Sequence, residues 1–355
     1  MAYWKDKIIP RSLKVLHCLS THEFAGTERH VAELVSAQMA DSDVTLLLEN
    51  QTRDRLTGGD ITDVLPPGLN VIRAGRGGYL LKLAKLVRKG GFDVVHTHLG
   101  RASARATWLK RAGIWNGTPL VATLHTSYRA RSYGVHDGLI CIASWQQNTL
   151  PPLQRARSTL IPNWTVAPTR SPEEKAELRR NLRQEWGLSD DCFVFGAVGR
   201  MVEEKDFSLL LKAWRLAALP ENAVLLMIGD GPERPRLEEE SKETGRVIFT
   251  GFRTDMPDAL AGLDAFVLPS RHEPFGLVLL EAMGAGLPVR AAASGGVLDI
   301  LKNNPDCLVA PQNIQALSDG LHELYGCPRG AWDLSGFSLD QQITKLDRFY
   351  RDLTR

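Results

Sequence analysis

Residues 270–289 read SRHEPFGLVLLEAMGAGLPV and follow a short apolar run, Ala265–Leu268, that has the composition of a buried strand. The stretch predicts a turn, then a helix, then a second strand at residues 288–291. Pro274 is suited to the first turn of the helix, and Gly286 to the turn that ends it. A strand, a helix and a further strand in this order predict a parallel sheet, with the helix starting at the carboxyl end of the first strand.

The same alternation extends over the whole chain. Short runs rich in Val, Ile and Leu occur at residues 13–18, 44–48, 71–72, 94–97, 120–124 and 139–142, and again at residues 194–198, 224–228, 247–249, 265–268 and 288–291. Helical patterns between them include residues 28–39, 80–89 and 207–218. Buried strands that alternate with helices predict an α/β fold with two doubly wound parallel sheets. We expect the two Rossmann-like domains to face a central cleft, because such sheets bind ligands at the carboxyl ends of their strands.

Prolines and a charged helical stretch mark the expected boundary between the domains. The first domain is predicted at residues 1–168 and the second at residues 169–337. Ser171 and Pro172 are suited to starting a connecting helix that Gly187 ends. Residues 338–355 have a helical pattern with no place in the second sheet, and we expect them to pack back on the first domain.

Composition excludes several classes of protein. The chain has 355 residues, 43% of them hydrophobic, and contains no apolar run long enough for a membrane span or a secretory signal. Its five cysteines lie far apart without a C-x-x-C pair, which argues against a disulfide framework or a structural zinc site. These features predict a cytoplasmic protein.

Charge is distributed unevenly along the chain. Residues 1–165 hold 21 Lys and Arg against 12 Asp and Glu, a balance of +9, whereas residues 166–355 hold 22 against 29, a balance of −7. The basic half predicts an anionic partner such as an acceptor glycan, a phosphorylated lipid or the inner membrane face. The candidate contacts are residues 79–91, Arg101, Arg105, Lys110 and Arg111. A solvated basic surface without a partner, and for residues 79–91 a helix packed on a sheet, explain the same pattern.

The loop before the predicted helix of residues 270–289 has the features of an anion site. The free N–H groups and the dipole of a helix N-terminus favour phosphate, and Gly276 lets the backbone approach a ligand closely. Glu273 and Glu281 bracket this start, and their carboxylates can accept hydrogen bonds from hydroxyl groups. An acid favoured by the helix dipole and a second, solvated glutamate would give the same pattern.

A second strand, turn and helix occur in residues 196–214, GAVGRMVEEKDFSLLLKAW. Arg200 and Lys205 lie in the turn, where their charges could neutralise a diphosphate. Arginine and lysine are common in surface loops, but the position of these two at the carboxyl end of a strand makes them candidates for ligand binding.

The predicted first domain offers one glycine turn and several histidines. Gly26 permits close backbone approach at the start of a helix, but it stands alone, so a G-x-G-x-x-G dinucleotide site is poorly supported. His17, His96, His98 and His125 lie at or near strand ends, and His125 is the best placed for the cleft. We expect no metal site, because the sequence shows no acid or third ligand near the H-x-H pair at residues 96–98. The D-x-D form at residues 41–43 precedes a strand and is interpreted as a loop.

Together these motifs resemble the family 4 retaining glycosyltransferases of the GT-B fold. The E-x7-E hallmark of that family corresponds to Glu273 and Glu281, and the G-R-x4-K loop to Gly199, Arg200 and Lys205. Further matches are IGDGP at residues 228–232, FTGF at residues 249–252, the strand at residues 264–269, and Gly295-Gly296. In the first domain the resemblance is thinner and rests on residues 26–29 and His125.

The resemblance implies a role for each candidate residue. It places Glu273 on the hydroxyls of the donor hexose, Glu281 on a ribose, Arg200 and Lys205 on the diphosphate, the backbone of Phe275, Gly276 and Leu277 and the turn at Gly26 on phosphate, and His125 near the reacting face of the sugar. Glu273, Arg200, Lys205 and His125 are therefore the catalytic candidates. Three positions depart from the family pattern, namely Ala25 for a first glycine, Asp299 for a glutamate, and Arg290 for a small or apolar residue.

The expected function is a metal-independent retaining hexosyltransferase without a cofactor. Its donor would be a nucleotide sugar, with a UDP-sugar as the commonest type in the family. Its acceptor would be a glycan or lipid-linked molecule of cell-envelope polysaccharide, lipopolysaccharide or glycolipid synthesis, with peripheral contact to the cytoplasmic membrane face. A sugar-nucleotide epimerase on the same plan and a non-catalytic nucleotide-sugar-binding scaffold remain open. A nucleic-acid-binding module has no recognised motif to support it.

Overall fold

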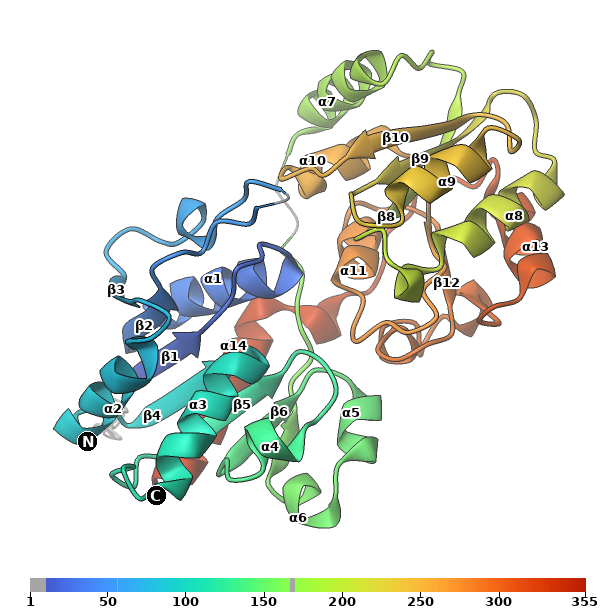
Figure 1. Cartoon of the computed structure of the whole chain (residues 1–355). Coiled ribbons are helices and arrows are strands. Elements are labelled where there is room, and N and C mark those ends of the chain that lie inside the picture. The colour runs from blue at the N-terminus through green and yellow to red at the C-terminus, as the bar shows by residue number, and fades with distance from the viewer. Residues whose placement is uncertain (1–10, 56, 167–169) are drawn as a thin grey trace, which may run out of the picture. The chain divides into compact units, whose positions relative to one another are not determined.

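The computed structural model describes residues 11–55, 57–166 and 170–355. The chain divides into two compact units of α/β structure, which are described separately (Figure 1). The first comprises residues 1–141, 146–161 and 343–355, and the second residues 142–145 and 162–342. The sequence places the domain boundary between residues 168 and 169, which lie outside the described residues.

The first unit contains a parallel sheet of seven strands in the order β3-β2-β1-β4-β5-β6-β7. The strands are β1 (Lys14–Leu19), β2 (Asp43–Glu49), β3 (Asn70–Ala74), β4 (Val94–His98), β5 (Leu120–Leu124), β6 (Gly138–Cys141) and β7 (Ser158–Leu160). From β1 the chain first adds strands on one side of the sheet, β2 and β3, and then adds β4 and the later strands on the other side. The place between β1 and β4 is therefore a topological switch point, where open α/β sheets bind ligands. The sequence predicted six of these strands and missed β7, which is three residues long and only half-buried.

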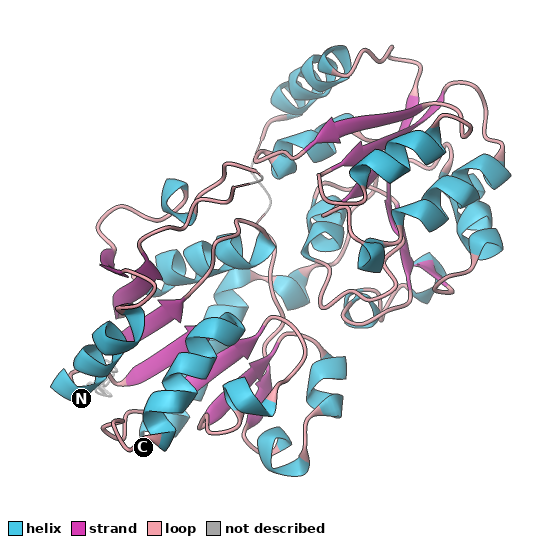
Figure 2. Cartoon of the chain, in the orientation of Figure 1, coloured by secondary structure: helices cyan, strands magenta, loops and turns pink. Residues whose placement is uncertain are grey.

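The helices of the first unit cover its sheet (Figure 2). The longer ones are α1 (Gly26–Gln38), α2 (Tyr79–Lys89), α3 (Leu99–Arg111) and α14 (Leu339–Thr354), and the short ones are α4 (Ala130–Tyr133), α5 (Ser144–Thr149), which begins in the second unit, and α6 (Pro152–Arg155). The C-terminal part of α14 packs against β6 so closely that a Cβ on Gly138 would lie 2.7 Å from Phe349. Residues 343–355 thus belong to the first unit, although they are the last in the chain.

The second unit contains a parallel sheet of six strands in the order β10-β9-β8-β11-β12-β13. The strands are β8 (Phe193–Val198), β9 (Ala223–Ile228), β10 (Val247–Gly251), β11 (Ala265–Leu268), β12 (Val289–Ala292) and β13 (Leu308–Val309). Its switch point lies between β8 and β11. All strands but the two-residue β13 were predicted from the sequence.

Helices lie on both faces of the second sheet, so its strands are buried in apolar cores on each side. They are α7 (Pro172–Glu185), α8 (Phe207–Ala217), α9 (Arg234–Ser241), α10 (Met256–Ala259), α11 (Leu277–Gly284), α12 (Val297–Ile300) and α13 (Ile314–Leu324). The start of α7 is as predicted, with the Ser171 side chain accepting from Glu174 N in a capping box. The fold prediction of two doubly wound parallel sheets is therefore confirmed. No described helix is both long and apolar enough to cross a membrane.

Candidate functional site

The loop after β8 carries two basic residues that the sequence singled out. Arg200 follows the strand by two residues and is exposed, whereas Lys205 ends a short 3-10 helix, Glu203–Lys205, and is half-buried. A Cβ on Gly199 would lie 3.6 Å from the Lys205 methylene groups, so the lysine stem runs directly over this glycine. The loop therefore holds a lysine side chain at the carboxyl end of β8.

Lys205 forms an ion pair with Glu273, the first acid of the E-x7-E motif. The Nζ–Oε2 distance is 2.5 Å, and the Ser270 hydroxyl donates to the same oxygen at 3.0 Å. Glu273 is only 6% exposed, so its charge depends on these partners for compensation. The pair joins the loops after β8 and β11, the two strands that flank the switch point.

Two glycines fix the backbone of Glu273. Gly296 N donates to Glu273 O at 2.9 Å, and a Cβ on Gly295 would lie 2.0 Å from that same oxygen. Gly295 also has φ +52°, a backbone conformation that residues with a side chain rarely adopt. The Gly-Gly pair thus serves the close approach of the two turns and determines where the Glu273 side chain starts.

The helix of the motif begins later than the sequence predicted. Pro274 was expected in its first turn, but α11 begins at Leu277, with Gly276 as the N-cap at φ +105°. That prediction was wrong because residues 273–275 are held by the turn at Gly295 and Gly296, where a Cβ on Gly296 would lie 2.5 Å from Phe275 Cα. The first amides of α11 remain at this end of the helix, next to Glu273 in the chain.

Glu281 lies in the middle of α11 and lines a cavity of about 610 Å³. The wall also includes the basic residues Arg170, Lys175, Arg179 and Arg329 from α7, the segment before it and the segment after α13. Neither Glu273 nor Lys205 lines this cavity. The two acids of the motif therefore lie in different surroundings within the second unit.

An ion pair that the sequence analysis missed ties the two loops together again. Arg271 donates to both carboxylate oxygens of Asp206, with Nε–Oδ2 at 2.8 Å and Nη2–Oδ1 at 3.0 Å, and Arg271 N donates to Glu204 O at 2.9 Å. Asp206 is a non-glycine residue at φ +54°, a conformation that aspartate tolerates better than most residues. The motif spacing gives no sign of this pair, although it supports the loop that carries Lys205.

Trp145 is a further neighbour that sequence reasoning did not find. Its indole Nε1 donates to Pro274 O at 2.9 Å, and its ring meets His272 edge to face at 5.0 Å between centroids. Trp145 lies more than 120 residues before this loop in the chain. It covers the turn that contains Glu273.

Two of the positions that depart from the family pattern have structural partners. Asp299 accepts from Ser144 N at 2.6 Å, and Arg290 Nη2 donates to Glu323 on α13 at 2.6 Å. The stem of Arg290 also packs over Gly320, whose Cβ would lie 3.3 Å away. Both residues therefore have roles inside the second unit.

Gly26 opens α1 at the carboxyl end of β1, as the sequence predicted. It is exposed, and the preceding Ala25 is the N-cap, whose N–H donates to the buried Glu28 side chain at 3.0 Å. This half of a capping box satisfies the Ala25 N–H, whereas alanine has no side chain that could accept from the first amides of the helix. The turn is open to a ligand at Gly26.

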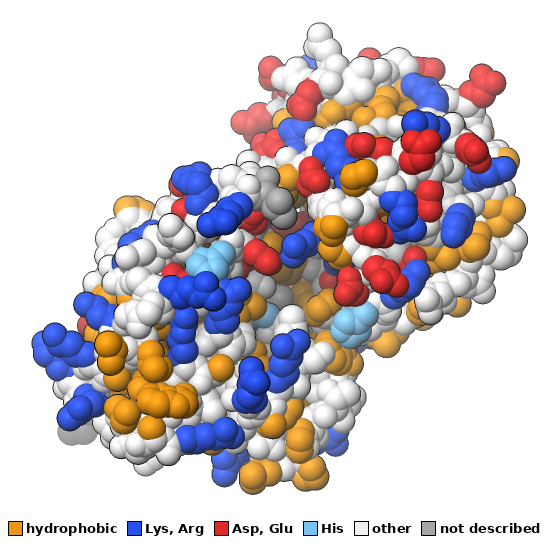
Figure 3. All heavy atoms as spheres, viewed as in Figure 1, with side chains coloured by type: hydrophobic (Ala, Val, Ile, Leu, Met, Phe, Trp, Pro, Cys, Tyr) orange, Lys and Arg blue, Asp and Glu red, His pale blue; other side chains and the backbone are white. Residues whose placement is uncertain are grey.

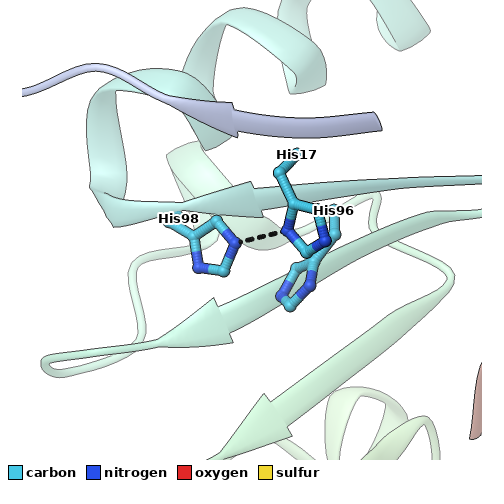
Figure 4. Close-up of side chains that lie close together, drawn as sticks. All are labelled: His17, His96 and His98. Carbon is cyan, nitrogen blue, oxygen red and sulfur yellow. Dashed lines mark hydrogen bonds between the residues drawn. The ribbon is translucent and has the colours of Figure 1, made fainter. Parts of the chain in front are cut away.

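Four histidines meet at the switch point of the first sheet. His17 lies on β1, and His96 and His98 lie on β4 (Figure 4). His125 follows β5. His17 Nδ1 lies 3.0 Å from His98 Nε2, and His98 Nδ1 lies 3.3 Å from His125 Nε2. Burial lowers the pKa of His17 and of His125 to about 4, and lowers those of His96 and His98 well below their usual range. All four imidazoles are therefore neutral at pH 7.

His17, His96 and His98 have nitrogen atoms within 4.8 Å of one another, the spacing of a metal site. The sequence analysis found no third ligand beside the H-x-H pair, and this was wrong, because β1 lies next to β4 and brings His17 opposite His96. Every ring nitrogen of the three nevertheless has a hydrogen-bond partner within the protein. A metal would have to displace these partners, so the arrangement is satisfied as a hydrogen-bonded network.

The basic candidates for acceptor binding fall into two groups. Arg105 donates to the buried Glu49 at 2.8 Å and stacks over the Tyr79 ring, and Lys110 pairs with Asp137 at 2.5 Å. Arg101 and Arg111 are exposed. Arg105 and Lys110 therefore have structural partners, whereas Arg101 and Arg111 lie at the surface.

Two sequence families match consecutive parts of the chain. Residues 24–185 match the family described as Glycosyltransferase Family 4, and residues 179–333 match Glycosyl transferases group 1. A lipopolysaccharide core biosynthesis glycosyltransferase of Rhizobium meliloti, LpsD, is 37% identical over 153 residues, which is 42% of this chain and 41% of that protein. The chain matches about two fifths of the length of this relative and of two other curated relatives.

Solved structures share the fold over nearly the whole chain. A glycosyltransferase from Rickettsia africae superimposes with a TM-score of 0.78 at 18% identity, covering 97% of this chain and 99% of that one. Anabaena HepE, solved in complex with UDP and glucose, superimposes with a TM-score of 0.70 at 21% identity, covering 96% and 97%.

Proposed function

Because the chain belongs to the family 4 glycosyltransferases, which have the GT-B fold, we propose that it transfers a hexose from a UDP-sugar to a glycan or lipid-linked acceptor with retention of configuration. The complex of HepE with UDP and glucose supports this choice of donor. The Rhizobium relative supports a place in the synthesis of lipopolysaccharide or another cell-envelope glycan.

The observation that carries the proposal is the pair of Lys205 and Glu273 at the switch point of the second sheet. A carboxylate accepts hydrogen bonds from sugar hydroxyls, and an ammonium group beside it neutralises the phosphate of a leaving nucleotide. Held 2.5 Å apart, these two groups would meet a sugar and its diphosphate at the same point. Arg200, exposed in the same loop, would supply a second positive charge.

The remaining candidates complete a donor site in this proposal. The amides of Phe275, Gly276 and Leu277 would bind phosphate oxygens at the start of α11, and Glu281 would bind the ribose hydroxyls from the middle of that helix. In the first unit, Gly26 would lie beside phosphate, and His125 would contact the sugar. These four roles are the part of the proposal that the family resemblance supplies.

The mechanism that suits these residues is attack on the same face of the sugar that the nucleotide leaves. The bond between C1 and the phosphate oxygen breaks, the bond between C1 and the acceptor oxygen forms, and the acceptor's proton passes to the departing phosphate. Lys205, Arg200 and the α11 amides stabilise the negative charge that develops on that phosphate. Two side-chain cations would provide the charge that a metal supplies in other transferases, and we therefore propose catalysis without a metal or cofactor.

The first experiment measures UDP release from a panel of nucleotide sugars in the presence of EDTA, with and without candidate acceptors. Glu273→Gln keeps the size of the side chain and removes the charge that faces Lys205. We expect release from one UDP-hexose by the wild type and a loss of at least about 100-fold in the variant, in the range found when one group that stabilises transition-state charge is removed.

The matched control is Glu323→Gln, which also removes a glutamate charge from an ion pair in the second unit. Its partner is Arg290, and the pair lies on α13 and β12. This variant should retain wild-type release. Equal losses in both variants would show that Glu273 acts only in folding, and donor binding without release under any condition would favour the scaffold. Conversion of the donor without an acceptor would favour the epimerase.

We also propose that the basic surface of the first unit contacts an anionic acceptor at the cytoplasmic face of the membrane. Figure 3 shows Lys and Arg side chains around an apolar patch on the face that carries α2 and α3. Leu81 on α2 is 73% exposed and Trp108 on α3 is 55% exposed, and Lys82 and Lys85 are exposed near them on α2. Apolar side chains beside lysines suit a lipid surface, where about 1 kcal/mol is gained per basic residue.

Vesicle sedimentation tests this surface. Vesicles in which about one lipid in three is anionic should bind the wild type, and the binding should weaken as salt is added. The double variant Lys82→Glu/Lys85→Glu should bind these vesicles at least about tenfold more weakly. Lys302→Glu alters an exposed lysine of the second unit and serves as the control. Binding that resists salt, or that the control weakens as much, would contradict the proposed surface.

A further inference from the structure

Seven polar side chains from five elements are buried together in the first unit. They are His17, Gln38, His96, His98, Thr123, His125 and Tyr350, and none is more than 6% exposed. They come from β1, α1, β4, β5 with the turn after it, and α14. A buried polar group without a partner is costly, so a cluster of this size must satisfy its own hydrogen bonds.

The contacts form two hydrogen-bonded arms. The first arm runs from His125 Nε2 to His98 Nδ1 at 3.3 Å, from His98 Nε2 to His17 Nδ1 at 3.0 Å, and from His17 Nε2 to Gln38 Oε1 at 2.7 Å. In the second arm, the Tyr350 phenol oxygen lies 2.6 Å from His96 Nδ1, and His96 Nε2 lies 2.8 Å from Thr123 Oγ1.

The amide of Gln38 sets the direction of the first arm. Its Oε1 can only accept, so His17 Nε2 must carry the proton that it donates. A neutral imidazole has one N–H, so His17 Nδ1 accepts from His98 Nε2, and His98 Nδ1 in turn accepts from His125 Nε2. The arm therefore ends with His125 protonated at Nε2 and unprotonated at Nδ1.

The second arm runs through His96. A neutral imidazole has one N–H, so His96 donates from one ring nitrogen and accepts at the other, between the Tyr350 phenol and the Thr123 hydroxyl. In the first arm all the donors point away from His125, and such aligned hydrogen bonds strengthen one another.

We propose that Gln38, His17 and His98 are positioning residues that hold the His125 imidazole in the tautomer whose Nδ1 accepts a hydrogen bond from a sugar hydroxyl. No link of either arm uses this nitrogen. If Gln38 turned its amide over, each link of the first arm would reverse, and His125 Nδ1 would become a donor. The amide of one buried glutamine thus decides whether His125 accepts from a hydroxyl or donates to it. The contact with sugar rests on the proposed function, but the tautomer does not.

The test is nitrogen NMR of the full chain labelled with ¹⁵N-histidine, because protonated and unprotonated ring nitrogens differ widely in chemical shift. The spectrum of His125→Gln identifies the His125 signals among those of the nine histidines. In the wild type we expect protonation of His125 at Nε2 alone. A wild-type spectrum with the proton on Nδ1 would overturn the proposal without any variant and without any activity measurement.

Gln38→Met preserves the shape of the side chain and removes both its acceptor and its donor. We expect a mixture of His125 tautomers and a fall in kcat for sugar transfer of at least about tenfold, since a misplaced proton on an oriented histidine impairs catalysis strongly. Thr123→Val is the matched control, because it removes a buried hydrogen-bond partner from the second arm. It should leave the His125 signals and kcat near wild type.

The two measurements separate the possible failures. An unchanged His125 tautomer in Gln38→Met would overturn the positioning role. A shifted tautomer with unchanged kcat would overturn the contact between Nδ1 and the sugar. If the protein transfers no sugar at all, the proposed function fails, while the nitrogen shifts still confirm or overturn the direction of the first arm. Should Gln38→Met fail to fold, the wild-type spectrum remains decisive.

Discussion

The two units have the same kind of sheet, with a switch point in each, but they fill that point with different chemistry. In the first unit, the neighbouring strands β1 and β4 carry His17, His96 and His98, all completely buried. In the second, the loops after β8 and β11 meet through the ion pairs Lys205–Glu273 and Arg271–Asp206. A neutral hydrogen-bonded network thus occupies the switch point of the first sheet, and charged groups occupy that of the second. The stabilities of the two units should therefore respond differently to pH, to an added methyl group and to loss of a hydroxyl group.

Acid should separate the two units most strongly. Six of the seven histidines in the first unit are buried, whereas His272 and His322, the two in the second, are exposed. Burial lowers the pKa of His17 and His125 to about 4, so between that pH and 6.5 the unfolded chain binds protons that the folded unit does not. The stability that these neutral groups confer is complete above pH 6.5 and is lost as pH falls toward 4. Lowering the pH from 7 to 5 should cost on the order of 2 kcal/mol for each of the two.

Hydrogen exchange followed by mass spectrometry, corrected for intrinsic rates, can measure this loss unit by unit. Peptides from β1, β4 and β5 should lose protection at pH 5 before those from β8 and β11. Equal loss in both units would contradict the difference in buried histidines, and earlier loss in the second would reverse it.

A methyl group added beside Glu273 should destabilise the second unit, as acid should destabilise the first. Gly295→Ala places a Cβ 2.0 Å from Glu273 O and a side chain at φ +52°. We expect a loss of about 2–3 kcal/mol in the free energy of unfolding of this unit, because backbone must move to admit the methyl group. Sugar transfer should fall further than stability, since Glu273 would be displaced.

Gly330→Ala is the control for this variant, because a Cβ at Gly330 would meet nothing within 4 Å. Urea unfolding followed by tryptophan fluorescence gives the stability, and UDP release gives the activity. Normal activity in Gly295→Ala would mean that the turn tolerates the methyl group without moving Glu273.

These two regions also differ in how far the sequence predicts them. Glu273, Lys205 and the glycines around them belong to short motifs in single loops, so a local pattern indicates where they meet. Even so, the start of α11 was placed too early, because Pro274 suits a first helical turn and nothing in the local sequence shows that Gly295 and Gly296 hold residue 273 in a turn.

The histidine network is assembled from residues far apart in the chain, and for that reason the sequence could not give it. His96 and Tyr350 are 254 residues apart, and His17 and His98 are 81 residues apart. The histidines were recognised as strand-end residues, but their contacts depend on strand order and register, which put His17 opposite His96. Gln38 and Tyr350 have no chemical signature of their own and were not predicted at all.

Removal of a buried hydroxyl should have a moderate effect that again differs between the units. Tyr350→Phe leaves His96 Nδ1 without its hydrogen-bond partner and breaks the link from α14 to the strands. We expect a loss of about 1–3 kcal/mol, the cost of an unsatisfied buried polar group. Tyr325→Phe removes a comparable bond in the second unit, between Tyr325 and Asn222, where the partly exposed Asn222 can turn to water instead. It should cost less than Tyr350→Phe in urea unfolding, and an equal or larger loss would show that the network is no more dependent on its hydroxyl than the surface is.

The smallest effect is expected at Arg290, where the chain departs from the family pattern. The residue lies on β12 and pairs with Glu323, whose side chain is 61% exposed, so water screens most of the attraction. Arg290→Lys keeps the charge and loses the two-nitrogen contact, and it should cost about 0.5 kcal/mol or less. If the residue acts only within this pair, KM for the UDP-sugar stays at the wild-type value. A rise in KM without a loss of stability would instead place Arg290 in the donor site and extend that site beyond the charged loops after β8 and β11.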